Sequence, residues 1–411
     1  MSDSYLYKPY KSKYVSVYNA FSPLFSVFGK SPKKKINFES LHELASKATG
    51  LSDFGPSDYH EGLHTLIDSI LEEKHFHSFG YFLAKGMIVE PLKNRLYLEE
   101  AYKRSPEIDD ERIDGAIWVL GLPRTGSTLL HNLLALDEEN RTLKRWEAAV
   151  PSPMDTDPKV DIEQRKKKAQ VTDKVLHILA PDLLKKHSMG WDLPEECVML
   201  FRDTFRSQLF GFSLGVEKYG EWLRNQDLSA AYAYYLRQLK VLQSQEKKTR
   251  WVFKAPFHSL HVDAIESVFN QPRYINLHRN PNSVLPSVAS LGETLQGMCS
   301  KYVDRRITGE HVLKECKLAI DSVEKSRKNI QDNRVVDVYF SDFIKDPSGT
   351  IEGVYEKWEL PFTEAYRAKI NEFMANNPKN KHGEHTYARE EYGLTDAQIN
   401  EEFGSYIASI R

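Results

Sequence analysis

The residues best suited to chemistry in this sequence form a short loop that could bind an oxyanion. Residues 121–128 read Gly-Leu-Pro-Arg-Thr-Gly-Ser-Thr, and they follow an apolar run and precede a segment typical of a helix. In such a turn, backbone N–H groups point into a concave space, and the start of the helix adds positive potential. The guanidinium of Arg124 would supply a cation inside the loop. The segment therefore predicts a binding site for a phosphate or sulfate group.

The glycine spacing of this loop is that of a Walker A loop, but its last two residues differ. Walker A loops end in Lys followed by Ser or Thr, whereas this chain has Ser127-Thr128. An NTPase usually needs both that lysine and a magnesium ligand. Asp337 and Asp342 lie in and after a later apolar run, so a magnesium ligand stays open. We interpret the loop as an oxyanion site, with a P-loop nucleotide kinase as the alternative.

A second candidate anion site lies at the end of the apolar run 273–278. Arg279 follows this run directly, and Ser287 stands eight residues later, in a segment that predicts a helix. An arginine presents a fork of N–H donors to a phosphate, and a hydroxyl group one or two turns into the helix can complete the contact. Lys254 ends another apolar run, 251–254, and precedes Arg279 by 25 residues.

The two candidate anion sites, and the order in which they occur along the chain, resemble those of sulfotransferases that use 3′-phosphoadenosine 5′-phosphosulfate (PAPS). The phosphosulfate loop of that family reads P-K-S-G-T-T or P-R-T-G-T-T after a strand, and residues 123–128 read P-R-T-G-S-T. Residues 121–134 are similar to the branch with G-L-P-R-T-G-[ST]-T-L-L-H-N-L-L. The resemblance covers roughly residues 110 to 390.

The resemblance implies which residues bind the nucleotide. The 5′-phosphosulfate would be held by Arg124, Thr125, Gly126, Ser127 and Thr128. The 3′-phosphate would be held by Arg279 and Ser287, and also by Lys381 and Gly383, because Lys381-His382-Gly383 resembles a C-terminal loop of the family.

The resemblance also implies a reaction. The sulfuryl group of PAPS would pass in line to a hydroxyl or amine of a small-molecule acceptor, leaving 3′-phosphoadenosine 5′-phosphate (PAP), without a metal ion. Arg124 and Lys254 are the candidate catalytic cations. A catalytically inactive nucleotide-binding protein of the same fold is a further alternative.

The identity of the general base stays open. Pro256 stands where the cytosolic branch of the family has its catalytic histidine. Four candidates are left: Glu195 and Glu196, in a Pro-Glu-Glu segment related to one in similar sequences, and His258 and His187. We interpret His131, in the helix that follows the loop, as a packing residue.

The elements that must position these residues alternate between strands and helices. Apolar runs at 116–120, 251–254, 273–278 and 335–340 each precede a predicted helix. This alternation predicts an α/β fold with a P-loop-like parallel sheet flanked by helices. We expect residues 1–110 to form a helical N-terminal extension packed on the core, and residues 111–411 to form the sulfotransferase-type domain. A helical insertion at 137–249 would supply much of the acceptor pocket.

Composition excludes several classes of protein. The chain has 411 residues, of which 41% are hydrophobic and 28% charged, as in globular proteins. A net charge of −2 does not indicate a nucleic-acid partner. The apolar stretch Val15 to Phe28 is interrupted by Asn19, Ser22 and Pro23, so we expect no membrane insertion. We interpret the basic cluster at 33–35 as a solvated loop.

The three cysteines, Cys197, Cys299 and Cys316, form no C-x-x-C pair and no metal-ligand spacing. This pattern fits a reducing compartment, and together with an N-terminus that lacks a signal-peptide core it predicts a cytoplasmic protein. A homodimer is left open.

Overall fold

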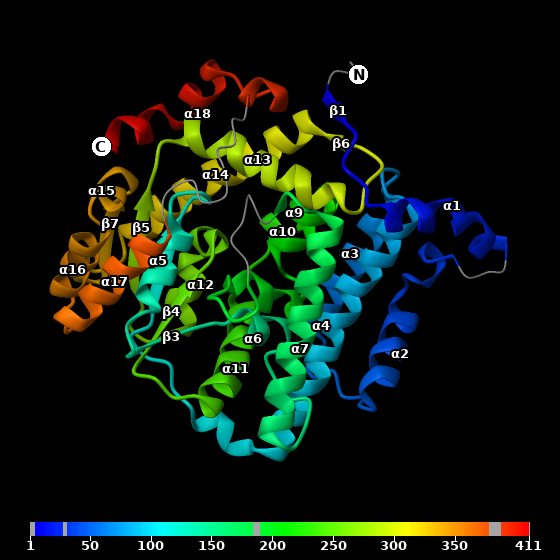
Figure 1. Cartoon of the computed structure of the whole chain (residues 1–411), viewed down its shortest axis with the longest axis horizontal. Coiled ribbons are helices and arrows are strands. Elements are labelled where there is room, and N and C mark those ends of the chain that lie inside the picture. The colour runs from blue at the N-terminus through cyan, green and yellow to red at the C-terminus, as the bar shows by residue number, and fades with distance from the viewer. Residues whose placement is uncertain (1–4, 28–30, 184–189, 378–387, 411) are drawn as a thin grey trace.

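The computed structural model describes residues 5–27, 31–183, 190–377 and 388–410. Its centre is a five-stranded sheet in the order β3-β4-β2-β5-β7, in which every neighbouring pair is parallel (Figure 1). The strands are β2 (Ile117–Gly121), β3 (Asn140–Thr142), β4 (Arg250–Lys254), β5 (Arg273–His278) and β7 (Val335–Tyr339). The predicted parallel α/β fold with flanking helices is confirmed.

The central strand β2 is buried on both faces. Trp118 and Leu120 join one hydrophobic core, and Ile117 and Val119 join the other. This division follows from the alternation of side chains along a strand. A parallel sheet covered on both faces needs such a continuous apolar run, which is why β2 was visible in the sequence.

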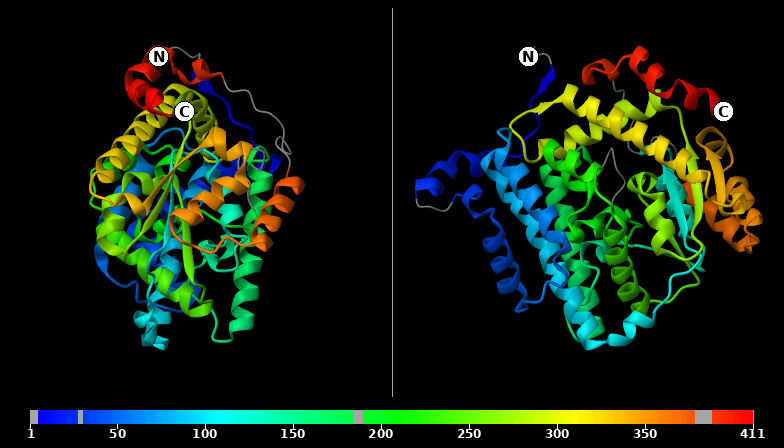
Figure 2. Two further views of the ribbon diagram at one scale, coloured as in Figure 1. Left: turned by 90° about the vertical axis from the view of Figure 1, so that its left-hand side faces the viewer. Right: turned by 180° about the vertical axis from the view of Figure 1, so that it is seen from behind.

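One face of the sheet is covered by helices from the N-terminal segment and from the insertion, which share a single core with Trp118, Trp251 and Phe253 (Figure 2). These helices are α2 (Phe38–Thr49), α3 (His60–Glu72), α4 (Ser78–Arg104), α6 (Arg145–Ala149), α9 (Gln208–Leu214), α10 (Glu217–Arg224) and α11 (Ser229–Gln245). Helix α7 (Pro158–Leu179) packs against α6. The short helix α12 (Val262–Val268) packs against α11.

The other face is covered by the helix after the loop and by C-terminal helices: α5 (Ser127–Leu134), α15 (Phe340–Lys345), α16 (Pro347–Lys357) and α17 (Glu364–Asn376). A third core joins α13 (Pro281–Gly297), α14 (Arg305–Arg327) and α18 (Asp396–Ser409). At the N-terminus, β1 (Leu6–Tyr7) pairs with β6 (Val303–Asp304), and α1 (Lys13–Val27) follows.

Local sequence signals explain where the long helices begin. The carboxylate of Asp157 accepts hydrogen bonds from Lys159 N and Val160 N at the start of α7, and Asp304 caps α14 in the same way. Side-chain acceptors at these positions satisfy backbone N–H groups that have no partner within the helix. The caps therefore hold the starts of two helices whose side chains line the cavity described below.

Candidate active site

The oxyanion loop connects β2 to α5 and depends on two glycines. Gly121 lies opposite Leu277 in the register of β2 and β5, and a Cβ atom there would come within 2.5 Å of the Leu277 carbonyl oxygen. Gly126, with φ of 88°, precedes the first turn of α5. Arg124 also has a positive φ, of 65°, which is uncommon for a residue with a side chain. The backbone therefore bends sharply around Arg124.

The two predicted anion sites meet in one cluster. Arg124 Nε donates to Ser287 Oγ at 3.0 Å, and Arg279 Nη1 donates to the carbonyl oxygen of Arg124 at 2.5 Å. The Arg279 guanidinium carbon lies 4.0 Å from the centre of the Phe340 ring, in a cation–π contact. Burial, and next the nearby charge of Arg124, lower the pKa of Arg279 from its ordinary value. Two neighbouring guanidiniums create a strong local attraction for an anion.

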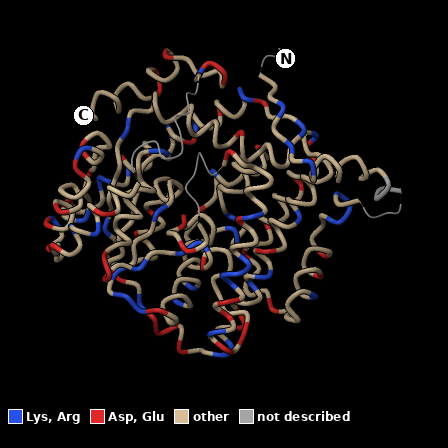
Figure 3. Tube along the Cα trace, viewed as in Figure 1, with Lys and Arg blue, Asp and Glu red and all other residues tan. Residues whose placement is uncertain are grey.

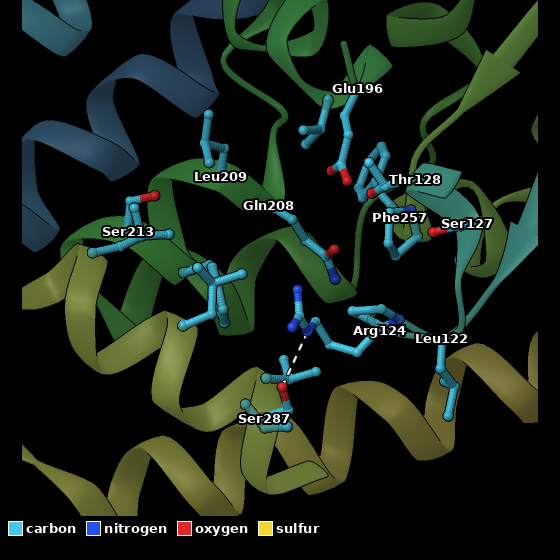
Figure 4. A pocket seen from close by; sticks show the side chains of 18 of the residues that line it. Leu122, Arg124, Ser127, Thr128, Glu196, Gln208, Leu209, Ser213, Phe257 and Ser287 are labelled. Carbon is cyan, nitrogen blue, oxygen red and sulfur yellow. Dashed lines mark hydrogen bonds between the residues drawn. The ribbon is translucent and has the colours of Figure 1, made fainter. Parts of the chain in front are cut away.

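Lys254 lies between this loop and a carboxylate. The residue is 2% exposed and ends β4, and its Nζ is 2.6 Å from Glu196 Oε1 and 3.4 Å from Thr128 Oγ1. Thr128 is the second residue of α5. The chain thus brings a buried ammonium group, a carboxylate and the hydroxyl that ends the oxyanion loop to one point. Glu196 and Thr128 of this group are labelled in Figure 4.

The Pro-Glu-Glu segment is held beside the continuation of β3. Glu195 N donates to Leu143 O at 2.7 Å, and Glu195 forms an ion pair with Arg145, which also binds Asp173 at 2.6 Å. The other Glu195 oxygen accepts the backbone N–H of Glu196 at 2.8 Å. Glu195 therefore fixes the segment, while the side chain of Glu196 reaches Lys254.

The histidine candidates occupy different surroundings. His258 is fully buried, its Nδ1 lies 2.8 Å from the Tyr232 hydroxyl, and its ring packs edge-on against Trp118. Burial holds the pKa of His258 well below its ordinary value. His131 is also buried, and burial lowers its pKa to about 3. His187 lies outside the described residues, as do Lys381 and Gly383.

Within the loop, the side chain of Thr125 serves the fold. Thr125 is fully buried, and its hydroxyl donates to Leu122 O at 2.8 Å. Among the residues predicted to bind the nucleotide, those that line the cavity below are Arg124, Gly126, Ser127, Thr128, Arg279 and Ser287. Thr125 can thus offer its backbone N–H, but its hydroxyl is already used.

The predicted nucleotide-binding residues that the structure describes, other than Thr125, line one end of a cavity of about 980 Å³. Arg124, Ser127 and Ser287 lie at this polar end, Glu196 faces it, and Leu209 lies farther along (Figure 4). The rest of the wall is largely apolar and comes from α4, α7, α9 and α13; we call this part the apolar arm. Its lining includes Leu83, Met87, Leu176, Leu179, Met199, Leu209, Leu291, Leu295 and Met298.

The candidate oxyanion loop, the cationic second anchor and Glu196 thus line one cavity, and Lys254 is paired to Glu196. A model of the sulfotransferase family matches residues 116–364, more than half of the chain. The protein belongs to the sulfotransferase family. The match includes the loop, Glu196, Lys254, Arg279 and the helix that carries Ser287.

This sulfotransferase is similar to several mycobacterial proteins. It is 23% identical over 304 residues, 71% of this chain and 75% of the relative, to the omega-hydroxy-beta-dihydromenaquinone-9 sulfotransferase Stf3 of Mycobacterium bovis, and equally to that of Mycobacterium tuberculosis. Among solved structures, the sulfotransferase STF9 of Mycobacterium avium superimposes with a TM-score of 0.80 at 27% identity. This superposition covers 90% of this chain and 96% of STF9. Sulfotransferase STF1 of M. tuberculosis gives 0.78 at 27% identity, covering 90% and 98%.

Several residues of this sulfotransferase's site were not foreseen from the sequence. Phe340 follows β7 directly, a position at the carboxyl edge of the sheet that could have been noticed. Gln208 and Arg145 come from the insertion, where no spacing signal marks them. Across the described residues, no group of three His, Cys, Asp or Glu side chains is arranged to hold a metal ion. No helix there has the length and apolar character to cross a membrane.

Proposed function

We propose that this protein transfers a sulfuryl group from PAPS to a hydroxyl group of an apolar small-molecule acceptor. One observation carries the proposal: Glu196, which lines the cavity shared by the cationic cluster and the apolar arm, forms an ion pair of 2.6 Å with Lys254 beside Thr128. A donor anion on one side and an acceptor on the other would therefore meet at this pair.

The chemistry of the polar end fits a doubly anionic nucleotide. Arg124 and Arg279 supply two guanidiniums, Ser287 and Thr128 supply hydroxyl groups, and the start of α5 supplies backbone N–H donors. Charge-assisted hydrogen bonds from guanidinium groups to phosphate or sulfate oxygens are among the strongest that proteins form. We infer that the loop holds the 5′-phosphosulfate and that Arg279 and Ser287 hold the 3′-phosphate.

The side chains then have separate roles in the transfer. PAPS, when bound, supplies an activated sulfuryl group. Glu196 accepts the proton of the acceptor hydroxyl, and Lys254 directs its ammonium toward the negative charge that develops on the leaving side. Arg124 and the loop N–H groups stabilise the same charge. Because Lys254 starts paired to Glu196, the ammonium group must shift from the carboxylate as the proton is transferred.

The choice of Glu196 over the other bases rests on placement. Glu196 lines the cavity and its side chain is 22% exposed, so an acceptor can approach it. Glu195 is engaged by Arg145, and His258 is enclosed by aromatic side chains. Glu195 therefore positions the base, and His258 belongs to the core that supports Lys254.

The apolar arm supports an acceptor with a large apolar body. Such a surface gains about 25 cal/mol for each Å² of apolar area that it removes from water, which favours hydrocarbon ligands over sugars. The relative Stf3 is named for an omega-hydroxy acceptor, which supports a hydroxyl as the group that receives the sulfuryl group.

The test is a transfer assay with PAPS labelled with ³⁵S and a panel of acceptors: hydroxylated lipids, phenols, steroids and sugars. We expect label on an apolar alcohol and none on sugars. Calorimetry with PAP and with ATP and magnesium separates the alternatives, because a nucleotide kinase would prefer ATP. Tight PAP binding without transfer to any acceptor in the panel or in a cell extract would indicate an inactive nucleotide-binding protein.

A further inference from the structure

The N-terminal segment has a charge unlike that of the rest of the chain. Residues 4–38 contain seven lysines and no Asp or Glu, whereas the whole chain has a net charge of −2. The seven are Lys8, Lys11, Lys13, Lys30, Lys33, Lys34 and Lys35. The same segment is rich in Tyr and Phe. Lysines interspersed with aromatic residues are typical of segments that lie on membrane surfaces.

Helix α1 in this segment carries apolar side chains on its outer side. Tyr14, Val17 and Phe21 are 61%, 56% and 57% exposed. Their spacing of three and four residues places them on one face of the helix. The helix stands out from the body of the molecule (Figure 1). This face is therefore an apolar strip that nothing in the described part of the chain covers.

Lysines border this strip. Lys33, Lys34 and Lys35 form an exposed 3₁₀ turn, and Lys13 Nζ lies 5.4 Å from the centre of the Tyr14 ring. Figure 3 marks the basic residues along this part of the trace. On α4, Lys85 Nζ lies 5.6 Å from the centre of the Phe82 ring, and burial, followed by the charge of Lys35, lowers the pKa of Lys85. The lysines therefore repel one another and favour an anionic partner.

The strip continues onto the helix that lines the cavity. The Tyr18 ring of α1 packs on Phe79 and Phe82 of α4 at 5.3 and 5.9 Å between ring centres. Phe82 is itself 45% exposed. On the same helix, Leu83, which follows Phe82 directly, and Met87 line the apolar arm. The exposed face and the arm are thus two sides of the same helix.

We propose that this face binds the surface of a membrane that contains anionic lipids. We call it the N-terminal surface: Tyr14, Val17, Phe21 and Phe82, with Lys13, Lys33, Lys34, Lys35 and Lys85. The apolar side chains enter the boundary between headgroups and acyl chains, and the lysines contact lipid phosphates. Self-association through this surface is disfavoured, because a two-fold contact would bring two lysine clusters together.

Adsorption without spanning agrees with the absence of a membrane-crossing helix in the described residues. It also gives the basic cluster at 33–35, first interpreted as a solvated loop, a partner. If the proposed function holds, the location has a further consequence: an acceptor dissolved in the bilayer would lie close to α4 and the apolar arm. The membrane contact itself does not depend on sulfuryl transfer.

The experiment is flotation of the full chain with vesicles of phosphatidylcholine alone, or of phosphatidylcholine with 30 mol% phosphatidylglycerol. We expect partition to the anionic vesicles only, weakening as salt is raised. The charge variant is Lys33→Glu with Lys34→Glu and Lys35→Glu. Each lysine near an anionic surface contributes about a factor of five, so this variant should bind on the order of 100-fold less.

A matched control makes the same change of net charge elsewhere: Lys248→Glu with Lys325→Glu and Lys328→Glu, all on exposed positions. This control should keep most of the binding. The double variant Val17→Ser with Phe21→Ser should lose at least tenfold, because both side chains are exposed and their removal leaves the core intact. Circular dichroism and the melting temperature, measured without nucleotide, report that each variant is folded.

Three results would overturn the proposal. Equal partition to neutral and anionic vesicles would remove the role of the lysines. If the control and the 33–35 variant lost equal vesicle binding, net charge alone would explain the effect, and the position of the lysines would not matter. A dimer in sedimentation velocity that Val17→Ser with Phe21→Ser converts to a monomer, together with no vesicle binding, would assign the surface to a second copy of the chain instead.

Discussion

The hydrogen bond from Arg124 Nε to Ser287 Oγ, 3.0 Å long, joins two segments that are 163 residues apart. Arg279 adds a second link, because its guanidinium binds the backbone oxygen of Arg124 at 2.5 Å. The two predicted anchors are therefore parts of one cluster. Each anchor can still be tested separately, with ligands that do or do not carry a 3′-phosphate.

Arg279→Ala should weaken PAP binding by about 10- to 100-fold, the equivalent of one lost hydrogen bond to a charged group at ~1.5–3 kcal/mol. Adenosine 5′-phosphate lacks the 3′-phosphate, so its affinity should change much less. Calorimetry with both nucleotides measures the difference. Equal losses for the two ligands would show that Arg279 does not bind the 3′-phosphate.

Arg124→Ala should abolish measurable transfer, because it removes a cation from the loop and the donor to Ser287. Ser287→Ala is the comparison, since it removes the hydroxyl but leaves the loop cation. We expect Ser287→Ala to retain activity at high PAPS with a raised KM. Steady-state kinetics separates the two, and a normal kcat in Arg124→Ala would exclude its catalytic role.

Glu196→Gln should lower kcat by about 10²- to 10⁴-fold, the range of general-base catalysis, with PAP affinity little changed. The amide keeps the shape of the side chain but cannot take a proton at neutral pH. His258→Asn serves as the comparison at the other candidate base, and its kcat should stay within a few-fold. If His258→Asn were the inactive variant instead, the assignment of the base would be reversed.

Glu195→Gln should chiefly lower the free energy of unfolding and should affect kcat less. Arg145 is 8% exposed, and the change leaves it paired with Asp173 alone. Removing one partner of a buried ion pair costs up to ~3–5 kcal/mol of stability. Because Asp173 stays paired with Arg145, we expect a smaller loss, of about 2 kcal/mol. Urea denaturation gives the free energy of unfolding. A lower kcat with unchanged stability would instead make Glu195 a catalytic residue.

Stability should fall as the pH drops below about 6.5, the ordinary pKa of histidine. Burial lowers the pKa of His131 to about 3 and of His77 to about 4, so both stay neutral in the folded protein while the unfolded chain takes up protons. Each such histidine contributes a slope of at most ~1.4 kcal/mol per pH unit, lost as the pH falls. Urea midpoints at pH 7.5, 6 and 5 measure the slope.

His131→Asn tests the origin of that slope, since asparagine can still donate toward the Val252 carbonyl but does not titrate. We expect a smaller decrease in stability between pH 6.5 and 5 than in the native protein. An unchanged slope would mean that His131 is not a source of the acid sensitivity.

From the sequence alone, the α/β class could be predicted, and the loop at 121–128 and the cationic strand ends could be proposed as anion sites. The reason is that these features are local: a glycine-bounded turn after an apolar strand, and Arg279 eight residues before Ser287, carry their chemistry in adjacent residues. The strand β3 was missed, because its residues Asn140–Thr142 form no apolar run and only the ladder with β4 reveals it.

The three-dimensional arrangement of the chain distinguishes the candidate bases by their placement. In the sequence, His258 stands four residues from Lys254 and Glu196 stands 58 away, yet Glu196 meets the lysine and His258 turns into the core. Sequence distance fails here because the carboxyl ends of parallel strands gather segments from the whole chain. His258 is buried against Trp118 and Tyr232, which keeps it away from Lys254. This burial likewise results from packing between elements that are distant in the sequence.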